Sequence, residues 1–475
     1  MSAGPTDTTA VSAPGKVLLA GGYLVLDRAY TGLVFGLSAR INVIAQAIKT
    51  SPGVQLNEIA VYSPQFREAQ WTYGYHLADQ DGGIQVTQLR TGTALHANPF
   101  VETTLSYGLT YVSRLASLGP AHTINSCRLT ILADNDYYSQ PNETANANAN
   151  ASSTSTSTTN RFARFPTTLA GANKTGLGSS AALVTSLTAA ILSHYLPVDL
   201  FDLSTDAGRE TLHNLAQAAH CAAQGKVGSG FDVAAAVYGS CTYRRFSPSV
   251  LAGIPEPGKP GFSGALQTVI ASKKGASAGA SGNGSGPVTG WDTEIAKGSV
   301  ALPAGMALRM CDVDCGSQTV SMVKKVLAWR SSAPEASKTL WDTLQTRNEA
   351  LATALRDGKT DDDTIPALLR SIRELVRSMG TESGVPIEPE RQTALLDAVS
   401  DVEGVYGGVV PGAGGFDAVS LLVRDDKETE SRLEAFLEKW SKESGGRVRL
   451  LGVKGAMEGV RREDKSVYEG WLQPL

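Results

Sequence analysis

The chain has 475 residues, of which 42% are hydrophobic and 19% are charged, and its formal net charge is -4. This length exceeds one typical hydrophobic core and predicts two domains. The small negative charge, without any run of basic residues, argues against nucleic acid or an anionic membrane as a partner.

Five cysteines occur in the chain without a Cys-x-x-Cys pair. An odd, scattered set of this kind predicts reduced thiols and argues against a disulfide framework or a zinc site. The first residues lack the apolar stretch of a secretory leader, and no apolar run is long enough to span a bilayer. We therefore expect a cytoplasmic protein with no membrane partner.

The first third of the chain predicts a mixture of strands and helix. Residues 1–12 are small and polar, which predicts a frayed tail. A short apolar strand at residues 17–20 ends in a Gly-Gly break, and the alternation of residues 40–48 continues a sheet. Helical periodicity follows at residues 100–115, and a further strand is expected at residues 127–133.

Two low-complexity stretches interrupt this pattern, at residues 144–160 and 273–289. Their content of small and polar residues cannot bury a core, so both are expected to be disordered surface insertions. The second contains Gly-Ala-Ser-Ala-Gly at residues 275–279, a formal match to the serine-hydrolase elbow. That elbow requires a strand before it and a helix after it, and neither is predicted here, so the match is rejected.

The remaining elements alternate between helices and strands. The expected helices cover residues 206–224, 318–329, 334–380 (as two helices) and 431–443, and the expected strands lie within residues 300–313, 418–423 and 448–453. Because no clean strand–helix–strand repeat occurs, the pattern favours an α+β fold over a doubly wound parallel sheet.

One glycine-rich stretch lies directly before a strong helical pattern. It runs from Lys174 to Leu183 and reads KTGLGSSAAL. Its two glycines would let backbone N–H groups converge on an anion, a helix N-terminus favours phosphate, and a hydroxyl there can ligate Mg²⁺. The alternative is an ordinary serine-capped helix after a glycine turn. The stretch alone leaves both interpretations open.

Two more glycine-rich segments lie far from this one in the sequence. PGKVLLAGGYLVL spans residues 14–26, and GVVPGAGGFDA spans residues 408–418. Three such segments, with a lysine beside the first and an aspartate after another glycine turn, suggest phosphoryl transfer. In this order they resemble the three signature motifs of the GHMP kinases, the family of galactokinase, homoserine kinase, mevalonate kinase and phosphomevalonate kinase.

Further segments resemble the phosphomevalonate kinases within that family. They are ADNDYYSQ at residues 133–140, AQGKVGSGFDVAAAVYGS at residues 223–240 and DVDCGSQTVSMVKKVLAWR at residues 312–330. The resemblance implies an S5-like N-terminal domain at residues 1–250, a variable region at residues 251–300 and a ferredoxin-like C-terminal domain at residues 301–475.

The resemblance also implies a reaction. The γ-phosphoryl group of ATP would move to the terminal phosphate of (R)-5-phosphomevalonate, in the mevalonate route to isoprenoids and sterols. The implied partners are ATP and phosphomevalonate, the implied cofactor is Mg²⁺, and we expect a monomer. Positioning and charge stabilisation would dominate such a reaction, because the protein does little covalent chemistry in it.

Catalytic roles carry over to two residues. Lys16 matches the lysine of the first motif and would bridge the donor and acceptor phosphates, and Asp232 matches the catalytic aspartate. Because the acceptor is already an anionic phosphate, Asp232 could orient Lys16 and the acceptor in place of acting as a base. Apart from the resemblance, Lys16 could be a solvated residue and Asp232 a helix N-cap. The implied ATP-binding residues are Lys174, Thr175, Gly176, Leu177, Gly178, Ser179, Ser180 and Ala181.

The expected metal ligands depart from the family pattern. Several members carry a glutamate that helps to hold Mg²⁺, on the helix before the catalytic aspartate. The corresponding turn here contains His220 and no carboxylate. Ser180 is therefore the protein ligand that we expect, with ATP oxygens and water completing the octahedron.

The acceptor carries a phosphate and a carboxylate, so its site requires basic and hydroxyl groups. Tyr23 would line the acceptor pocket or belong to an apolar layer, and Arg244 is a weaker candidate. The turn at residues 411–415 should bring backbone close to the substrate, because only glycine permits that approach. The substrate-binding residues carried over from the matching segments are Tyr23, Ser139, Lys226, Ser229, Ser317, Thr319, Gly412 and Gly414.

Two alternatives use the same fold. One is a related kinase that phosphorylates mevalonate or a sugar. The other is a regulator that binds ATP without turnover. A regulator predicts loss of Lys16, of the glycine-rich stretch or of Asp232, and all three are present.

Overall fold

The computed structural model describes residues 8–49, 51, 56–89, 97–116, 124–139, 161–272, 290–313, 319–359, 363–444 and 446–472. The two low-complexity stretches and Ser317, for which the sequence analysis made predictions, lie outside the described residues. Among the described helices, none is both long and apolar enough to cross a bilayer.

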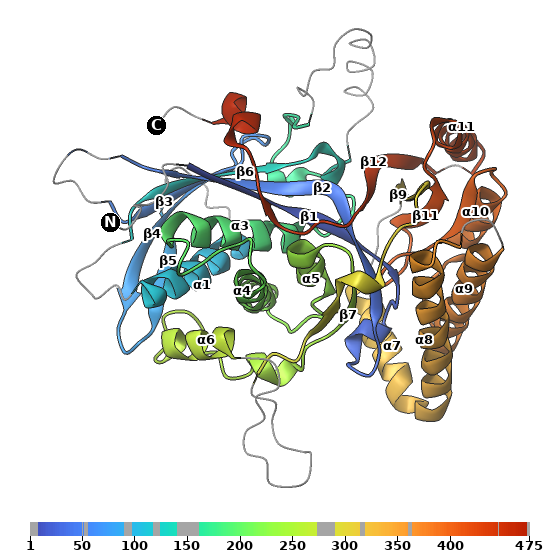
Figure 1. Ribbon diagram of the computed structural model, residues 1–475, viewed down its shortest axis with the longest axis horizontal. Coiled ribbons are helices and arrows are strands. Elements are labelled where there is room, and N and C mark those ends of the chain that lie inside the picture. The colour runs from blue at the N-terminus through green and yellow to red at the C-terminus, as the bar shows by residue number, and fades with distance from the viewer. Residues whose placement is uncertain are drawn as a thin grey trace.

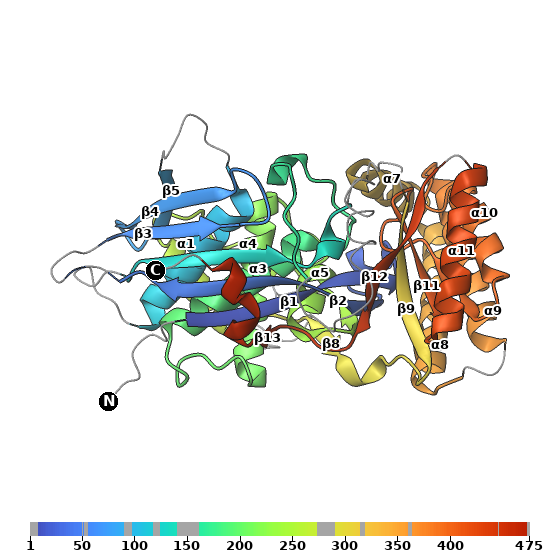
Figure 2. The ribbon, with the colours of Figure 1, turned by 90° about the horizontal axis from the view of Figure 1, so that it is seen from above.

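The N-terminal part is built on a large, mainly antiparallel sheet (Figures 1 and 2). Two long strands, β1 (Thr8–Ala20) and β2 (Gly32–Ala47), pair along nearly their whole length and are buried at most positions. The sheet continues from β2 through β6 (Cys127–Ala133), β3 (Glu58–Tyr62), β4 (Gln70–Ala78) and β5 (Gly83–Leu89). Of these pairings, β3 with β6 is parallel.

The expected frayed tail is wrong for the residues from Thr8 onward. Strand β1 begins at Thr8, and residues 9–14 are buried and pair with β2, while Val11 and Ser12 also pair with β13 (Arg461–Arg462). The hydroxyl of Ser12 donates to Glu463 (2.6 Å) and accepts from Arg40 (2.6 Å). Small polar residues here meet polar partners from distant segments, which local composition could not reveal.

Five helices cover one face of this sheet (Figure 1). They are α1 (Pro99–Leu115), α3 (Ser179–Tyr195), α4 (Asp206–Gln224), α5 (Phe231–Tyr238) and α6 (Phe262–Ala271). Helix α3 is buried on nearly every side because alanine, serine and threonine let β1, α1 and α4 approach it closely. Thr205 caps α4 by accepting the N–H of Gly208 (3.0 Å).

The C-terminal part has its own antiparallel sheet, in the order β10–β11–β9–β12. Its strands are β9 (Met306–Val313), β10 (Val405–Val409), β11 (Ala418–Arg424) and β12 (Val448–Ala456). Its helices are α7 (Thr319–Ser332), α8 (Pro334–Arg356), α9 (Thr364–Ser383), α10 (Glu390–Ser400) and α11 (Lys427–Ser444). Leucines of α10 and α11 pack on β9 and β11 to form a separate apolar core.

Strand β12 joins the two sheets. Its first half pairs with β9, and Gly455 and Ala456 then pair with Leu37 and Gly36 of β2. After β12 the chain returns to the N-terminal sheet through β13 and the 3-10 helix η7 (Lys465–Trp471). Strand β7 (Cys241–Arg244) pairs with the first residues of β2, and β8 (Glu294–Ala296) pairs with β7.

Most predicted elements are confirmed. The helix at residues 206–224 and the strand at residues 127–133 have the predicted bounds, and α8 and α9 are the two helices expected within residues 334–380. Segregated helices and mainly antiparallel strands confirm the α+β class. Helix α10 was not predicted, because its apolar residues are few and a proline-flanked segment precedes it.

Candidate active site

The first two glycine-rich segments lie against each other, although about 150 residues separate them in the sequence. The N–H of Lys16 donates to the carbonyl oxygen of Leu177 (2.9 Å), which joins β1 to the loop before α3. Gly176 and Gly178 both have left-handed backbones, with φ of 73° and 81°, and Gly178 is the N-cap of α3. The N-terminus of a buried helix therefore opens beside the strand that carries Lys16.

The side chain of Lys16 runs along this loop. A Cβ on Gly178 would lie 2.8 Å from the aliphatic carbons of Lys16, so the glycine makes room for that stem. The ammonium group donates to the carbonyl oxygen of Gly176 (3.4 Å) and lies 5.6 Å from the ring centroid of Phe231. Burial lowers the pKa of Lys16, and the nearby Asp232 carboxylate partly opposes that effect.

Asp232 lies in the first turn of α5, behind Gly230, which is the N-cap. Its Oδ1 atom accepts the N–H of Val233 (3.0 Å), and its Oδ2 atom lies 3.9 Å from Nδ1 of His220. The alternative of an N-cap aspartate is therefore wrong. The carboxylate faces the site that Lys16 and α3 form.

His220 connects this carboxylate to the glycine-rich loop. The residue is 2% exposed, and its Nε2 atom lies 3.1 Å from the hydroxyl oxygen of Ser180 and 3.1 Å from Nε2 of Gln224. In the sequence, His220 only marks the turn where a glutamate is missing. No motif contains it, and the contact exists because α4 packs across the N-terminus of α3.

A cavity of about 90 Å³ opens on the other side of the loop. Aromatic and aliphatic side chains form its walls, among them Trp71, Phe100 and Tyr138, while Lys174, Ser179 and Ser180 lie at its polar edge. Apolar walls with a few polar groups at one edge are typical of a small-molecule site. The aromatic wall was not recognised in the sequence, because its residues come from separate strands and helices.

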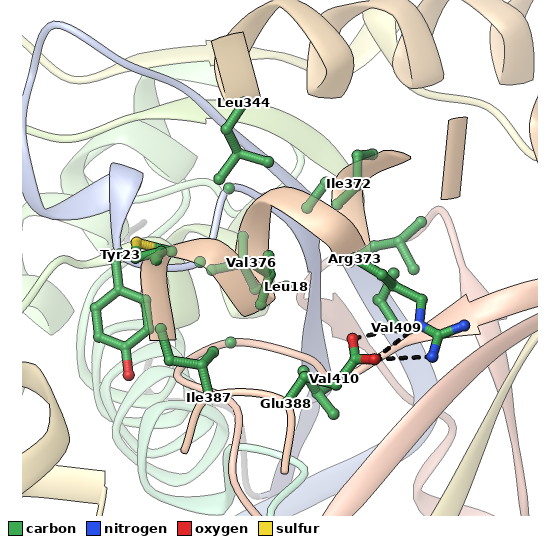
Figure 3. Close-up of a pocket in the computed structure, with 16 residues that line it drawn as sticks. Leu18, Tyr23, Leu344, Ile372, Arg373, Val376, Ile387, Glu388, Val409 and Val410 are labelled. Carbon is green, nitrogen blue, oxygen red and sulfur yellow. Dashed lines mark hydrogen bonds and ion pairs between the residues drawn. The ribbon is translucent and has the colours of Figure 1, made fainter. Parts of the chain in front are cut away.

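The third glycine-rich segment reaches the same strand from the C-terminal part (Figure 3). The N–H of Gly412 donates to the carbonyl oxygen of Leu18 (3.1 Å), and the hydroxyl of Tyr23 donates to that of Ala413 (2.7 Å). Tyr23 is buried, with φ of 65° and ψ of -40°, an uncommon conformation for a residue other than glycine. Strand β1 thus brings all three segments together.

The other predicted acceptor residues have different surroundings. Ser139 donates to the Asp312 carboxylate (2.9 Å), and the carbonyl oxygen of Ser229 accepts the hydroxyl of Tyr243 (2.7 Å). Lys226 is exposed just after α4, and Thr319 is the first residue of α7.

Arg244 forms several local contacts. Its guanidinium donates to Glu294 (3.1 Å) and to the carbonyl oxygens of Arg28 and Ala29 (2.8 and 3.0 Å). These contacts use Nε and Nη1 of Arg244, and its role toward an acceptor stays a prediction.

The geometry suits the transfer of a phosphoryl group between phosphates. A helix N-terminus, a half-buried cation and a carboxylate meet beside an apolar cavity, and the three groups come from α3, β1 and α5. Backbone amides and a lysine can stabilise anionic oxygens without any covalent intermediate.

Comparisons with known proteins agree on a family. Residues 164–240 match the GHMP kinases N terminal domain. The chain is 61% identical to Phosphomevalonate kinase ERG8 of Gibberella zeae, over 98% of this chain and 99% of that protein. It is 45% identical to Phosphomevalonate kinase erg8 of Aspergillus fumigatus, with the same coverage.

The fold matches solved structures at low sequence identity. One is the Streptococcus pneumoniae phosphomevalonate kinase in complex with phosphomevalonate and AMPPNP. It aligns with a TM-score of 0.60 at 16% identity, covering 94% of this chain and 99% of that one. At this identity the match supports the fold alone.

Proposed function

The chain belongs to the phosphomevalonate kinases of the GHMP kinase family, and we propose that it transfers the γ-phosphoryl group of ATP to (R)-5-phosphomevalonate. The products are (R)-5-diphosphomevalonate and ADP. The observation that carries this function is the 61% identity over 98% of the chain. It is supported by the convergence of Lys16, the glycine-rich loop and Asp232 on one site.

ATP occupies the N-terminal half of the site in this proposal. The base lies in the cavity walled by Trp71, Phe100 and Tyr138, where aromatic and aliphatic groups suit a flat heterocycle. The phosphates extend along residues 174–181 toward the N-terminus of α3, whose free amides attract anions. The open space around Gly176 leaves that approach unobstructed.

Lys16 stabilises the transferring phosphoryl group. The contact of its ammonium group with the loop carbonyl of Gly176 and its electrostatic interaction with the Asp232 carboxylate support this role. Half-burial strengthens its interaction with phosphate, because water screens the charge less there.

Asp232 orients this lysine and does not need to remove a proton. A phosphate monoester has a second pKa of about 6, so the acceptor oxygen is largely anionic at neutral pH. The carboxylate raises the pKa of Lys16 against the effect of burial, which helps to keep the ammonium charged.

The Mg²⁺ proposal rests on the donor groups near Ser180. The Ser180 hydroxyl and the Asp232 carboxylate both face His220, so two oxygen donors lie around one imidazole. No cluster of three or more His, Cys, Asp or Glu side chains suitable for a metal occurs in the part of the chain that the structure describes. This sparse set fits Mg²⁺, which takes most of its ligands from nucleotide phosphates and water. Bound there through Ser180, the cation would neutralise charge on the β- and γ-phosphates.

The acceptor lies on the C-terminal side of Lys16. In this proposal Tyr23, Gly412 and Gly414 contribute to that side, where Tyr23 and Gly412 line one small cavity. The other proposed contributors are Ser139, Lys226, Ser229, Ser317 and Thr319. Tyr23 acts in this proposal through the backbone of Ala413, which its hydroxyl contacts.

We propose a monomer in the cytoplasm, which light scattering on the purified chain and imaging of a fluorescent fusion would test.

An assay of ADP release tests the function. Phosphomevalonate should support ATP turnover that requires Mg²⁺, while mevalonate and galactose should not. Turnover with mevalonate but not phosphomevalonate would support the related kinase. ATP binding without turnover on any of these acceptors would support the non-catalytic regulator.

A further inference from the structure

One carboxylate in the C-terminal part is completely enclosed. The side chain of Glu388, in the segment between α9 and α10, is 0% exposed and accepts from Arg373 Nε (3.0 Å) and Nη2 (2.8 Å). Arg377 Nη1 (2.8 Å) and the hydroxyl of Thr393 (3.1 Å) donate to the same oxygen. Figure 3 shows Arg373 and Glu388 facing each other across this contact. Charge-assisted bonds from two guanidiniums fix the position of the carboxylate.

Stability alone is a poor explanation for this ion pair. Desolvation of two buried charges offsets much of their attraction, and apolar residues of similar size often stabilise a protein as well. What a fully bonded buried pair does provide is a defined position for the backbone on either side of it. The consequence depends on which backbone Glu388 holds.

That backbone holds the PGAGG turn, residues 411–415. The N–H of Gly415 donates to the carbonyl oxygen of Ile387, the residue before Glu388 (2.8 Å). A Cβ on Gly414 would lie 2.1 Å from the same oxygen, so the turn lies directly against Ile387. Any shift of Ile387 must therefore move the turn.

The PGAGG turn also holds the strand that carries Lys16. Gly412 bonds to Leu18, which lies two residues after Lys16 on β1, and Ala413 accepts the hydroxyl of Tyr23. The uncommon backbone of Tyr23 requires surroundings that enforce it. The cavity between the turn, α9 and β1 measures about 20 Å³, space for about one water molecule. The turn therefore has little room to move relative to β1.

We infer that Arg373 and Glu388 are positioning residues for the acceptor half of the site. The ion pair holds Ile387, Ile387 holds the PGAGG turn, and the turn holds Tyr23 and the end of β1. This inference rests on the proposed function and adds to it two residues from a domain that lacks Lys16, Asp232 and the nucleotide loop. Because the ATP-binding loop does not depend on these contacts, the two substrates should respond differently to their loss.

Steady-state kinetics of the full-length Glu388→Gln variant test the inference. The KM for phosphomevalonate should rise about tenfold and kcat should fall, while the KM for ATP stays within about twofold of wild type. A purely structural role would lower the active fraction and leave both KM values unchanged. That result would overturn the inference.

Glu430→Gln is the matched control. Glu430 pairs with Arg309 (2.9 Å), a guanidinium that is 5% exposed in the same part of the chain, and the guanidinium also donates to the carbonyl oxygen of Leu451 (3.2 Å), outside the turn. The control should keep both KM values. If Glu430→Gln raises the KM for phosphomevalonate as much as Glu388→Gln does, the effect is not specific to the turn and the inference fails.

A double variant tests the connection to the N-terminal part. Tyr23→Phe removes the contact with Ala413, so adding Glu388→Gln to it should change the KM for phosphomevalonate by less than about threefold. If the two substitutions each raise the KM for phosphomevalonate and the double variant shows the product of both increases, the residues act separately, which would contradict the inference. If Glu388→Gln does not fold, Arg377→Met takes its place, since Arg377 is half-exposed and contacts the same carboxylate.

The wild-type measurement separates this inference from the proposed function. A wild-type enzyme that is inactive with phosphomevalonate contradicts the function itself. An active wild type with an unaffected Glu388→Gln variant contradicts the positioning role alone.

Discussion

Gly22 lies so close to Gly412 that a Cβ on Gly22 would come within 2.2 Å of the Gly412 carbonyl oxygen. The two residues are 390 positions apart, in the first and third glycine-rich segments. The glycine at residue 22 therefore serves the contact between the N-terminal and C-terminal parts, since no other residue could accept the backbone so near.

Gly22→Ala should separate these two segments. We expect kcat to fall at least about tenfold, because misplacement of catalytic groups by a fraction of an ångström is costly. Gly253→Ala is the control, since a Cβ there meets nothing within 4 Å and the residue lacks a positive φ. Wild-type kinetics for Gly22→Ala would contradict the importance of the contact.

Lys16→Met tests the role of the ammonium group. Loss of one preorganised charge aimed at the transferring group should lower kcat by about 10²- to 10³-fold, with little change in the KM for ATP. Lys454→Met is the control, because Lys454 forms an exposed ion pair with Asp425 (2.6 Å). A Lys16→Met enzyme within a few-fold of wild type would remove Lys16 from the mechanism.

Asp232→Asn should lower kcat by at least about 10²-fold, because it removes the group that orients Lys16. It also predicts a pH effect of defined sign. The carboxylate raises the pKa of Lys16, so its neutralisation lowers that pKa further. Since the charged ammonium is the active form, the alkaline limb of the residual activity should move to lower pH. A limb at the wild-type position would contradict the electrostatic link.

His220→Ala tests the connection between Ser180 and Asp232. Groups that orient a metal ligand typically change metal affinity by about 10- to 100-fold, so half-maximal activity should require about tenfold more Mg²⁺. His220→Gln should be milder, because its amide can still reach the Ser180 hydroxyl. Equal Mg²⁺ requirements for His220→Ala and wild type would show that the imidazole is only a packing residue.

Two buried histidines predict the response of stability to acid. Burial lowers the pKa of both His194 and His213 to about 4, against 6.5 in the unfolded chain, and each is 2% exposed. The unfolded state therefore binds more protons between these values, so stability is complete above about pH 6.5 and falls as the pH drops toward 4.

His213→Gln removes one of these groups. Between pH 7 and pH 5 the variant should lose about 2 kcal/mol less stability than wild type, measured by urea denaturation at both pH values. The same pH dependence in both proteins would mean that folding does not lower the pKa of His213.

Regular elements were largely predictable from the sequence, since periodicity reports which face of a helix or strand is buried. Helix α4 shows this well, because its apolar residues, its Thr205 cap and its terminal Gly225 all agree on its bounds. The strand at Thr8–Ser12 was not predictable, because small polar residues become buried there only through partners such as Arg40 and Glu463.

The residues of the candidate site also fall into predictable and unpredictable groups. Lys16, Asp232 and the glycine-rich loop lie in motifs and were named from the sequence. His220, Glu388 and the aromatic wall of the cavity act through contacts between distant elements, so no local pattern identifies them. Tyr23 was named, but its contact with Ala413 depends on the docking of the C-terminal part.

Phosphorus NMR of the reaction products is the most direct test of the central claim. With ATP, Mg²⁺ and phosphomevalonate, the purified chain should form one diphosphate monoester for each ADP, and the Asp232→Asn variant should form almost none. Release of inorganic phosphate without a new diphosphate, or equal product formation by Asp232→Asn, would contradict phosphoryl transfer to phosphomevalonate at this site.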